Sequence, residues 1–187
     1  MKKAVFLVLI TFSLAAAQAQ MSGIGVKAGL NLSSITNRDM KPGYHVGFLA
    51  HLRMGQSWAL QPEVVYSNQG AKYDLSNGET HTLNLNYINI PFLFQYNATP
   101  SLRLQTGPQV GFMTSVHDKV GSTETYFFDK NDFKDTDFSW SIGASYVGRG
   151  GIGVDARYNI GLSDINEGGG ATIKNNVAQI GVFMMLQ

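Results

Sequence analysis

Apolar residues alternate with small or polar residues along eight segments of this 187-residue chain. Period two places alternate residues on opposite faces of a β-strand, and helical spacing fits none of the segments over more than two turns. The eight segments cover residues 24–32, 44–53, 58–69, 87–96, 102–112, 138–146, 152–162 and 179–186. The pattern therefore predicts an all-β chain in which every strand has one apolar face.

The links between these segments alternate in length. Three short links occur at residues 54–57, 97–100 and 148–151, and four longer polar links occur at about residues 34–42, 72–82, 117–137 and 164–174. An antiparallel barrel that crosses a membrane has short turns at one end and long loops at the other. We therefore predict an all-β, eight-stranded antiparallel up-and-down transmembrane β-barrel with both termini in the periplasm.

The charge content decides which face of the strands meets the surroundings. Charged residues make up 14% of the chain, whereas about 25% is usual in a soluble domain. The polar faces consist mostly of Gly, Ser, Asn and Gln, and a water-facing surface would be richer in Lys and Glu. We therefore expect membrane lipid to contact the apolar faces and the polar faces to line a crowded lumen. The alternative is a soluble ligand-carrying barrel with its apolar faces inside, which a requirement for detergent would exclude.

The N-terminus has the features of a secretory signal peptide. Lys2 and Lys3 precede an apolar stretch, and Ala17-Gln18-Ala19 provides a small-x-small cleavage site. We predict that residues 1–19 are cleaved during Sec export to the outer membrane and that residues 20–187 form one barrel domain. A retained anchor is the alternative, but a stretch of about 14 apolar residues is short for a membrane-spanning helix.

Composition excludes several functional classes. The chain contains no cysteine, so neither disulfides nor thiolate metal sites are available. After removal of the two signal lysines, 12 basic and 13 acidic residues give a formal charge of 12 − 13 = −1. A nearly neutral chain has no electrostatic footprint for nucleic acid. We expect no nucleic-acid partner and a monomeric protein.

Four stretches of the sequence resemble segments of the outer-membrane β-barrel (porin-family) proteins common in Bacteroidetes. They are LQPEVVYSNQG at residues 60–70, LNYINIP at 85–91, TGPQVG at 106–111 and ARYNIGL at 156–162. The resemblance follows nearly the whole mature chain in order, and it implies an eight-stranded barrel similar to OmpX and to the membrane domain of OmpA. One departure concerns the C-terminus, where Leu186 occupies the place of the usual aromatic residue. This departure bears on assembly rather than on fold.

Charged residues on the polar faces form the first candidate site. They are Lys27, Arg53, Glu63, Arg103, Asp155 and Arg157. Counted from the short turns, Glu63 and Arg157 lie at similar heights, and so do Arg103 and Asp155. Side chains can meet across an eight-stranded barrel because its interior is only just wide enough for them. We predict that Glu63 pairs with Arg157 and Asp155 with Arg103, which plugs the lumen; a proton or ion path is the alternative.

The link at residues 117–137 forms the second candidate site. It combines acidic residues with aromatic residues that we expect to be exposed. The predicted partner-binding residues are Tyr126, Phe127, Phe128, Asp129, Asp132 and Phe133. A charged aromatic loop on a rigid rim suits an extracellular protein, a host surface or cations. The alternative is a hairpin that simply extends its two strands into solvent.

We find no arrangement of residues that predicts catalysis. His45 and His51 share a strand face, but six residues separate them by about 20 Å, so they cannot share a metal. His81 and His117 fall in predicted loops, where we expect them at the surface. We therefore predict no enzyme activity and no cofactor. The expected function is structural or a loop-mediated interaction, and the alternative is a narrow porin-like channel for small solutes.

Overall fold

The computed structural model describes residues 21–36, 38–74, 80–120, 123–125, 132–166 and 172–186. Eight of its strands are long: β1 (Met21–Ile35), β2 (Asp39–Arg53), β3 (Trp58–Asp74), β4 (Thr80–Asn97), β5 (Leu102–Val120), β7 (Thr136–Val147), β8 (Ile152–Gly161) and β9 (Asn175–Leu186). A three-residue strand, β6 (Thr123–Thr125), and a short 3-10 turn, η2 (Arg149–Gly151), complete the described elements. Among the described residues there is no helix with the length and apolar character that a membrane crossing needs.

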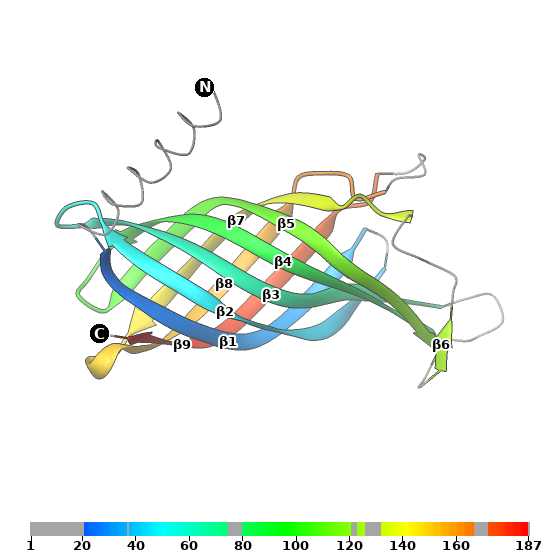
Figure 1. Cartoon of the computed structure of the whole chain (residues 1–187), viewed down its shortest axis with the longest axis horizontal. Helices are drawn as coiled ribbons and strands as arrows, with labels where there is room; N and C mark the ends of the chain where they lie inside the picture. The colour runs from blue at the N-terminus through cyan, green and yellow to red at the C-terminus, as the bar shows by residue number, and fades with distance from the viewer. Residues whose placement is uncertain are drawn as a thin grey trace, which may run out of the picture.

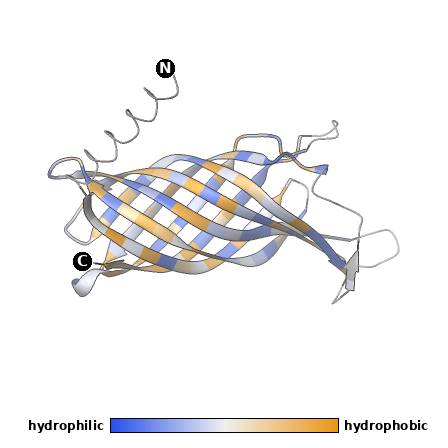
Figure 2. Ribbon diagram, viewed as in Figure 1, coloured by the Kyte–Doolittle hydropathy of each residue, from blue (hydrophilic) through white to orange (hydrophobic). Residues whose placement is uncertain are grey.

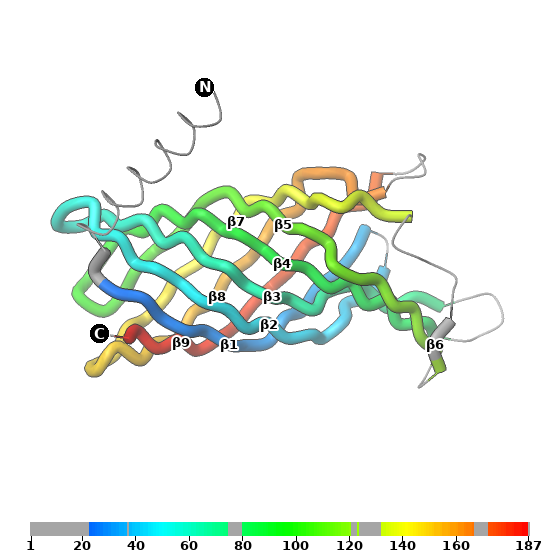
Figure 3. Tube along the Cα trace, viewed as in Figure 1, coloured from blue at the N-terminus to red at the C-terminus, as the bar shows by residue number. Residues whose placement is uncertain are grey.

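The long strands form a closed antiparallel ring. Each strand pairs with the next along the chain, and β9 pairs with β1 to close the barrel. The short strand β6 pairs only with the outer end of β5 and is not a member of the ring. Figures 1 and 3 show the strands tilted around a common axis, with the start of β1 and the end of β9 beside the short turns. The predicted eight-stranded up-and-down barrel is confirmed.

The wall is taller on one side of the barrel. Pairing between β4 and β5 continues to Val120, whereas pairing between β5 and β7 stops at Phe112. The longer side therefore extends past the rest of the wall, towards β6 in Figure 1. The prediction of long loops at residues 34–42 and 72–82 was wrong, because strands β1 to β4 occupy most of these stretches.

The two faces of the wall differ as the period-two pattern predicts. Outward side chains are apolar and exposed, as in Phe48 (69%) and Leu30 (65%), whereas Lys27, Glu63 and Arg157 point inward and are buried. Figure 2 shows hydrophobic and hydrophilic residues alternating along the strands. An apolar surface that surrounds the whole barrel is stable in lipid and not in water.

Prolines interrupt the wall at several places, among them the β2–β3 break between Met40 and His45 that contains Pro42. Pro62 on β3 lies where the β2–β3 register has no paired residues, between Leu49↔Glu63 and Leu52↔Leu60. Pro108 on β5 lies beside a similar break in the β4–β5 register. Proline has no N–H to contribute to a ladder, which accounts for these interruptions.

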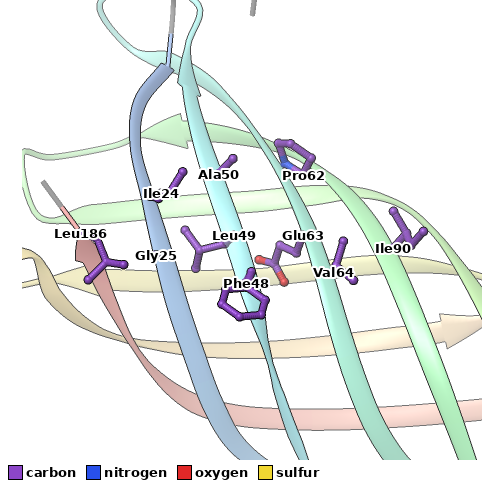
Figure 4. Close-up of a pocket in the computed structure, with 10 residues that line it drawn as sticks. All are labelled: Ile24, Gly25, Phe48, Leu49, Ala50, Pro62, Glu63, Val64, Ile90 and Leu186. Carbon is purple, nitrogen blue, oxygen red and sulfur yellow. The ribbon is translucent and has the colours of Figure 1, made fainter. Parts of the chain in front are cut away.

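An outer groove of about 440 Å³ lies next to the interruption at Pro62 (Figure 4). Its walls come from β1, β2, β3, β4 and β9, and nearly all the residues that line it are apolar. The charged side chain among them, Glu63, is itself only 2% exposed. The groove is therefore part of the lipid-facing surface.

An apolar cluster lies among polar side chains inside the end of the barrel opposite the short turns. A buried cluster consists of Ile35, Ala71, Leu83, Leu85, Tyr87, Met113, Phe133 and Ile165. The prediction that Phe133 is exposed was wrong, since it is only 6% exposed and forms a bridge with Asn166. Backbone hydrogen bonds from Met113 N–H to the Asp135 carbonyl (2.8 Å) and from Lys134 N–H to the Ile165 carbonyl (2.9 Å) hold this segment in the barrel mouth.

Candidate functional site in the barrel lumen

An ion pair crosses the centre of the lumen from β3 to β8. Arg157 donates two hydrogen bonds to the Glu63 carboxylate, from Nη1 to Oε2 at 3.0 Å and from Nη2 to Oε1 at 2.9 Å. Both side chains are almost fully buried. This is the pairing that the sequence predicts. Its two parallel bonds give it the fixed geometry of a bidentate guanidinium–carboxylate contact.

Two further charges complete a group of four, which we call the lumen quartet: Lys27, Glu63, Asp155 and Arg157. Lys27 Nζ lies 3.0 Å from Asp155 Oδ2 and 3.4 Å from Glu63 Oε2. Arg157 Nη2 lies 3.6 Å from the same Asp155 oxygen. The quartet therefore joins β1, β3 and β8 with two positive and two negative charges. Buried charges require such pairing, because each one has lost its hydration.

The predicted pairing of Asp155 with Arg103 was wrong. Both residues are in register with Ser145, so they lie in one row but on strands separated by β7. Lys27 reaches Asp155 instead, from β1. The prediction compared only heights along the strands, and strand tilt changes which side chains meet across a barrel.

The last two predicted lumen charges lie apart from the quartet, at the end of the barrel with the short turns. Arg53 is the final residue of β2, and Arg103 is the second residue of β5. Within the described ranges, neither guanidinium has a carboxylate within 4.0 Å. These two arginines are therefore not members of the ion-pair network.

Neutral polar side chains on both sides of the quartet were not singled out from the sequence. Asn31 Oδ1 lies 2.8 Å from His45 Nδ1 and accepts a hydrogen bond from Gln179 (2.9 Å). On the periplasmic side, Gln95 Nε2 donates to Gln61 Oε1 (2.9 Å) and to Gln105 Oε1 (3.0 Å). All of them occupy polar-face positions, so the pattern places them in the lumen. Their partners depend on the register of several strands, which the sequence does not show.

The lumen network consists of paired charges and hydrogen-bonded amides. The described residues contain no group of three or more His, Asp or Glu side chains that could hold a metal ion. The four charged side chains of the quartet form ion pairs with one another. Gln61 donates a further hydrogen bond to Glu63 (2.7 Å). Asp155 Oδ1 and Arg157 Nε are nevertheless buried without a hydrogen-bond partner among the described residues, so the quartet is paired in charge but not fully hydrogen-bonded.

A second polar cluster lies near the end of the barrel opposite the short turns. Tyr73 Oη donates to Asp118 Oδ2 (2.7 Å), and His81 Nδ1 lies 3.1 Å from the same oxygen. The expectation that His81 lies at the surface was wrong, because it is 1% exposed, whereas His117 is exposed. The guanidinium of Arg38 lies 4.5 Å from the centre of the Tyr73 ring. The cluster fastens β3, β4 and β5 together above the apolar part of the lumen.

The loop between β8 and β9 has its own anchor. The Asp164 carboxylate accepts hydrogen bonds from the backbone N–H groups of Ile173 (2.8 Å) and Asn166 (3.1 Å). These bonds favour the charged form and hold the pKa of Asp164 below its ordinary value. Of the predicted partner-binding residues, Asp132 is exposed, while Tyr126, Phe127, Phe128 and Asp129 lie outside the described residues.

Solved barrels from three bacteria have a similar fold. Neisserial surface protein A aligns with a TM-score of 0.63 and 14% identity, over 89% of this chain and 99% of that chain. Ail, the attachment invasion locus protein of Yersinia pestis, gives 0.54 and 12%, over 89% and 100%. The N-terminal barrel domain of Pseudomonas aeruginosa OprF gives 0.50 and 10%, also over 89% and 100%. At these identities the likeness concerns the fold alone.

The sequence itself was compared with curated proteins and with protein families. No curated protein matches it. Residues 16–167 match the family described as outer membrane protein beta-barrel domain. Because this match spans most of the chain and the structure has the corresponding closed barrel, the protein belongs to the outer membrane β-barrel domain family.

Proposed function

We propose that this protein is a monomeric outer-membrane barrel with a closed lumen, and that it acts through its extracellular side by binding a protein or surface ligand. In this proposal residues 1–19, which lie outside the described residues, direct Sec export and are removed. Residues 20–187 are then the mature barrel, of the type common in Bacteroidetes. The observation that carries the proposal is the lumen quartet, which joins strands on different sides of the interior.

Closure of the lumen is supported by layers that follow one another along the barrel axis. Glutamine side chains lie on the periplasmic side of the quartet, and the apolar cluster that includes Phe133 lies towards the extracellular end. An interior of eight strands leaves room for side chains and little else. A hydrated solute would have to displace both the ion pairs and the apolar cluster. The narrow porin-like channel is therefore the less favoured function.

An extracellular interaction is supported by the taller side of the wall. Strands β3 to β5 extend past the level at which β7 stops pairing, and they present polar side chains outward. A rigid sheet that extends beyond the lipid can position loops for binding. Among proteins of similar fold, Ail has also been solved in complex with the heparin analogue sucrose octasulfate. That complex concerns Ail, and for this chain it supports only the general mode of binding.

Conductance across a planar lipid bilayer tests the closed lumen. The wild-type barrel is expected to give only rare, small openings. A double variant, Glu63→Ala with Arg157→Ala, removes the cross-lumen pair while leaving Lys27 and Asp155 together, and it should open more often. A stable open-channel current from the wild-type protein would contradict closure and favour the porin-like alternative.

Replacing residues 126–131 with a Gly-Ser linker of equal length tests the extracellular role. The variant should still fold, because the described ring closes through strands outside this stretch. Cells that display it are expected to adhere less well than wild-type cells to a heparin-coated or a protein-coated surface, and the surface that shows the loss identifies the ligand class. Equal adhesion to both surfaces at equal display would contradict this part of the proposal.

A further inference from the structure

Two arginines at the periplasmic mouth of the lumen have no carboxylate partner among the described residues. Arg53 and Arg103 lie at strand ends beside the short turns, three strands apart around the ring. The lumen quartet is neutral, since its two cations face two carboxylates. Within the described ranges no carboxylate lies within 4.0 Å of Arg53 or Arg103. Two guanidinium groups that repel one another therefore face the lumen entrance without a counter-charge.

Arg103 is the more informative of the two arginines. Its side chain is half-buried, and its Nη1 atom is buried with no hydrogen-bond partner. Leaving a charged donor unpaired is costly when water cannot reach it. Part of the Arg103 side chain is nevertheless accessible from the mouth of the lumen. This combination suits a ligand that enters from the periplasm and accepts hydrogen bonds.

Neighbouring residues supply further groups of the right kind. Gln105, two residues along the same strand face, has a buried Nε2 donor without a partner, and Ser145, the register partner of Arg103, has a buried Oγ without one. Asn97, the register partner on the other side, adds an unpartnered Oδ1 acceptor. The register partner of Arg53 is Ala59, which adds no charged or polar side chain beside it.

We infer that Arg53 and Arg103 form an anion site in a periplasmic vestibule, and that its ligand is a small phosphate with a P–OH group: hydrogen phosphate or the monoanion of a phosphate monoester. The guanidinium groups, Gln105 and Ser145 donate to phosphate oxygens, while the Asn97 oxygen accepts from a P–OH group, which a carboxylate lacks. The ligand enters and leaves on the periplasmic side, because the quartet closes the lumen above it. This site is separate from the extracellular interaction and does not depend on it.

Titration of the mature full-length barrel in detergent micelles with inorganic phosphate tests the site. Ionic strength is held constant with sodium chloride, and binding is followed by ³¹P line width and by the rise in unfolding temperature. Arg53→Gln and Arg103→Gln should each weaken binding at least tenfold by our estimate, about the loss of one charge-assisted hydrogen bond. Arg149→Gln, which removes an exposed arginine at the same end of the barrel, should leave binding unchanged.

The outcomes separate the phosphate site from general attraction to positive charge. Wild-type protein that shows no response to phosphate, or a response that Arg103→Gln leaves intact, overturns the site. An equal loss in Arg149→Gln also overturns it, because the effect would then follow net charge. Acetate is titrated in parallel, and acetate that binds as tightly as phosphate overturns the assignment of the ligand. Each variant is first checked for the wild-type difference in gel mobility before and after boiling.

Discussion

Replacing Glu63 with alanine is expected to lower the free energy of unfolding by about 3–5 kcal/mol, the usual cost of removing one partner from a buried ion pair. Glu63 accepts hydrogen bonds from Arg157, Lys27 and Gln61. Without it, two buried cations lose a carboxylate and only Asp155 remains to balance them. Urea unfolding in lipid vesicles measures the loss, and the temperature of the gel-mobility transition should fall with it.

Two variants show whether the loss comes from the ion pair. Glu63→Ala combined with Arg157→Ala should recover part of the stability, because the double change no longer leaves Arg157 unpaired. Asp74→Ala, at an exposed acidic position on the same strand, should change stability by less than about 1 kcal/mol. An unfolding transition that Glu63→Ala leaves unchanged, with Arg157 intact, would refute the pairing.

Replacing Gly70 with alanine is expected to cost about 4 kcal/mol or more, in the range where a single change prevents folding of a marginal protein. Gly70 has φ +133°, a backbone conformation that L residues rarely adopt. A Cβ atom at this position would also overlap the carbonyl oxygen of Leu83 on the neighbouring strand. Since that oxygen belongs to the backbone, the strands would have to separate. The fraction of folded barrel after refolding, read from gel mobility, measures the effect.

Gly55 provides a matched control for this change. It has a similar φ of +125°, but a Cβ atom placed on it meets nothing within 4 Å. Gly55→Ala should therefore show the conformational cost alone, about 1–2 kcal/mol. If the two variants refold equally well, contact with the neighbouring strand is not what requires glycine at residue 70.

The sequence predicts the strands of the barrel well, because the two faces of a strand can be recognised from residues that are neighbours in the chain. Strand faces follow from period two, and the short turns follow from their length, so the inward position of Glu63 and the outward position of Phe48 can both be read from their neighbours. The partner of Asp155 could not be predicted in this way. It depends on how far each strand is shifted along the next around the ring, and a shift changes every contact across the lumen.

Phe133 illustrates a different limit. It lies in a polar stretch with other aromatic residues, and nothing in its neighbourhood indicates that it turns back into the barrel. Its burial results from the backbone hydrogen bonds to Met113 and Ile165, which are distant in sequence. The same stretch therefore contains a side chain that is part of the interior and an exposed one, Asp132.

The interruptions at Pro62 and Pro108 have a mechanical consequence. A barrel deforms most easily where two neighbouring strands share fewer hydrogen bonds. Its cross-section therefore tends to flatten at the β2–β3 and β4–β5 pairs. Glu63 is adjacent to the β2–β3 interruption at Pro62, and its ion pairs with Arg157 and Lys27 connect it to β8 and β1. The ion pairs of the lumen quartet therefore resist this flattening, because they connect β3 with β1 and β8 across the lumen next to Pro62.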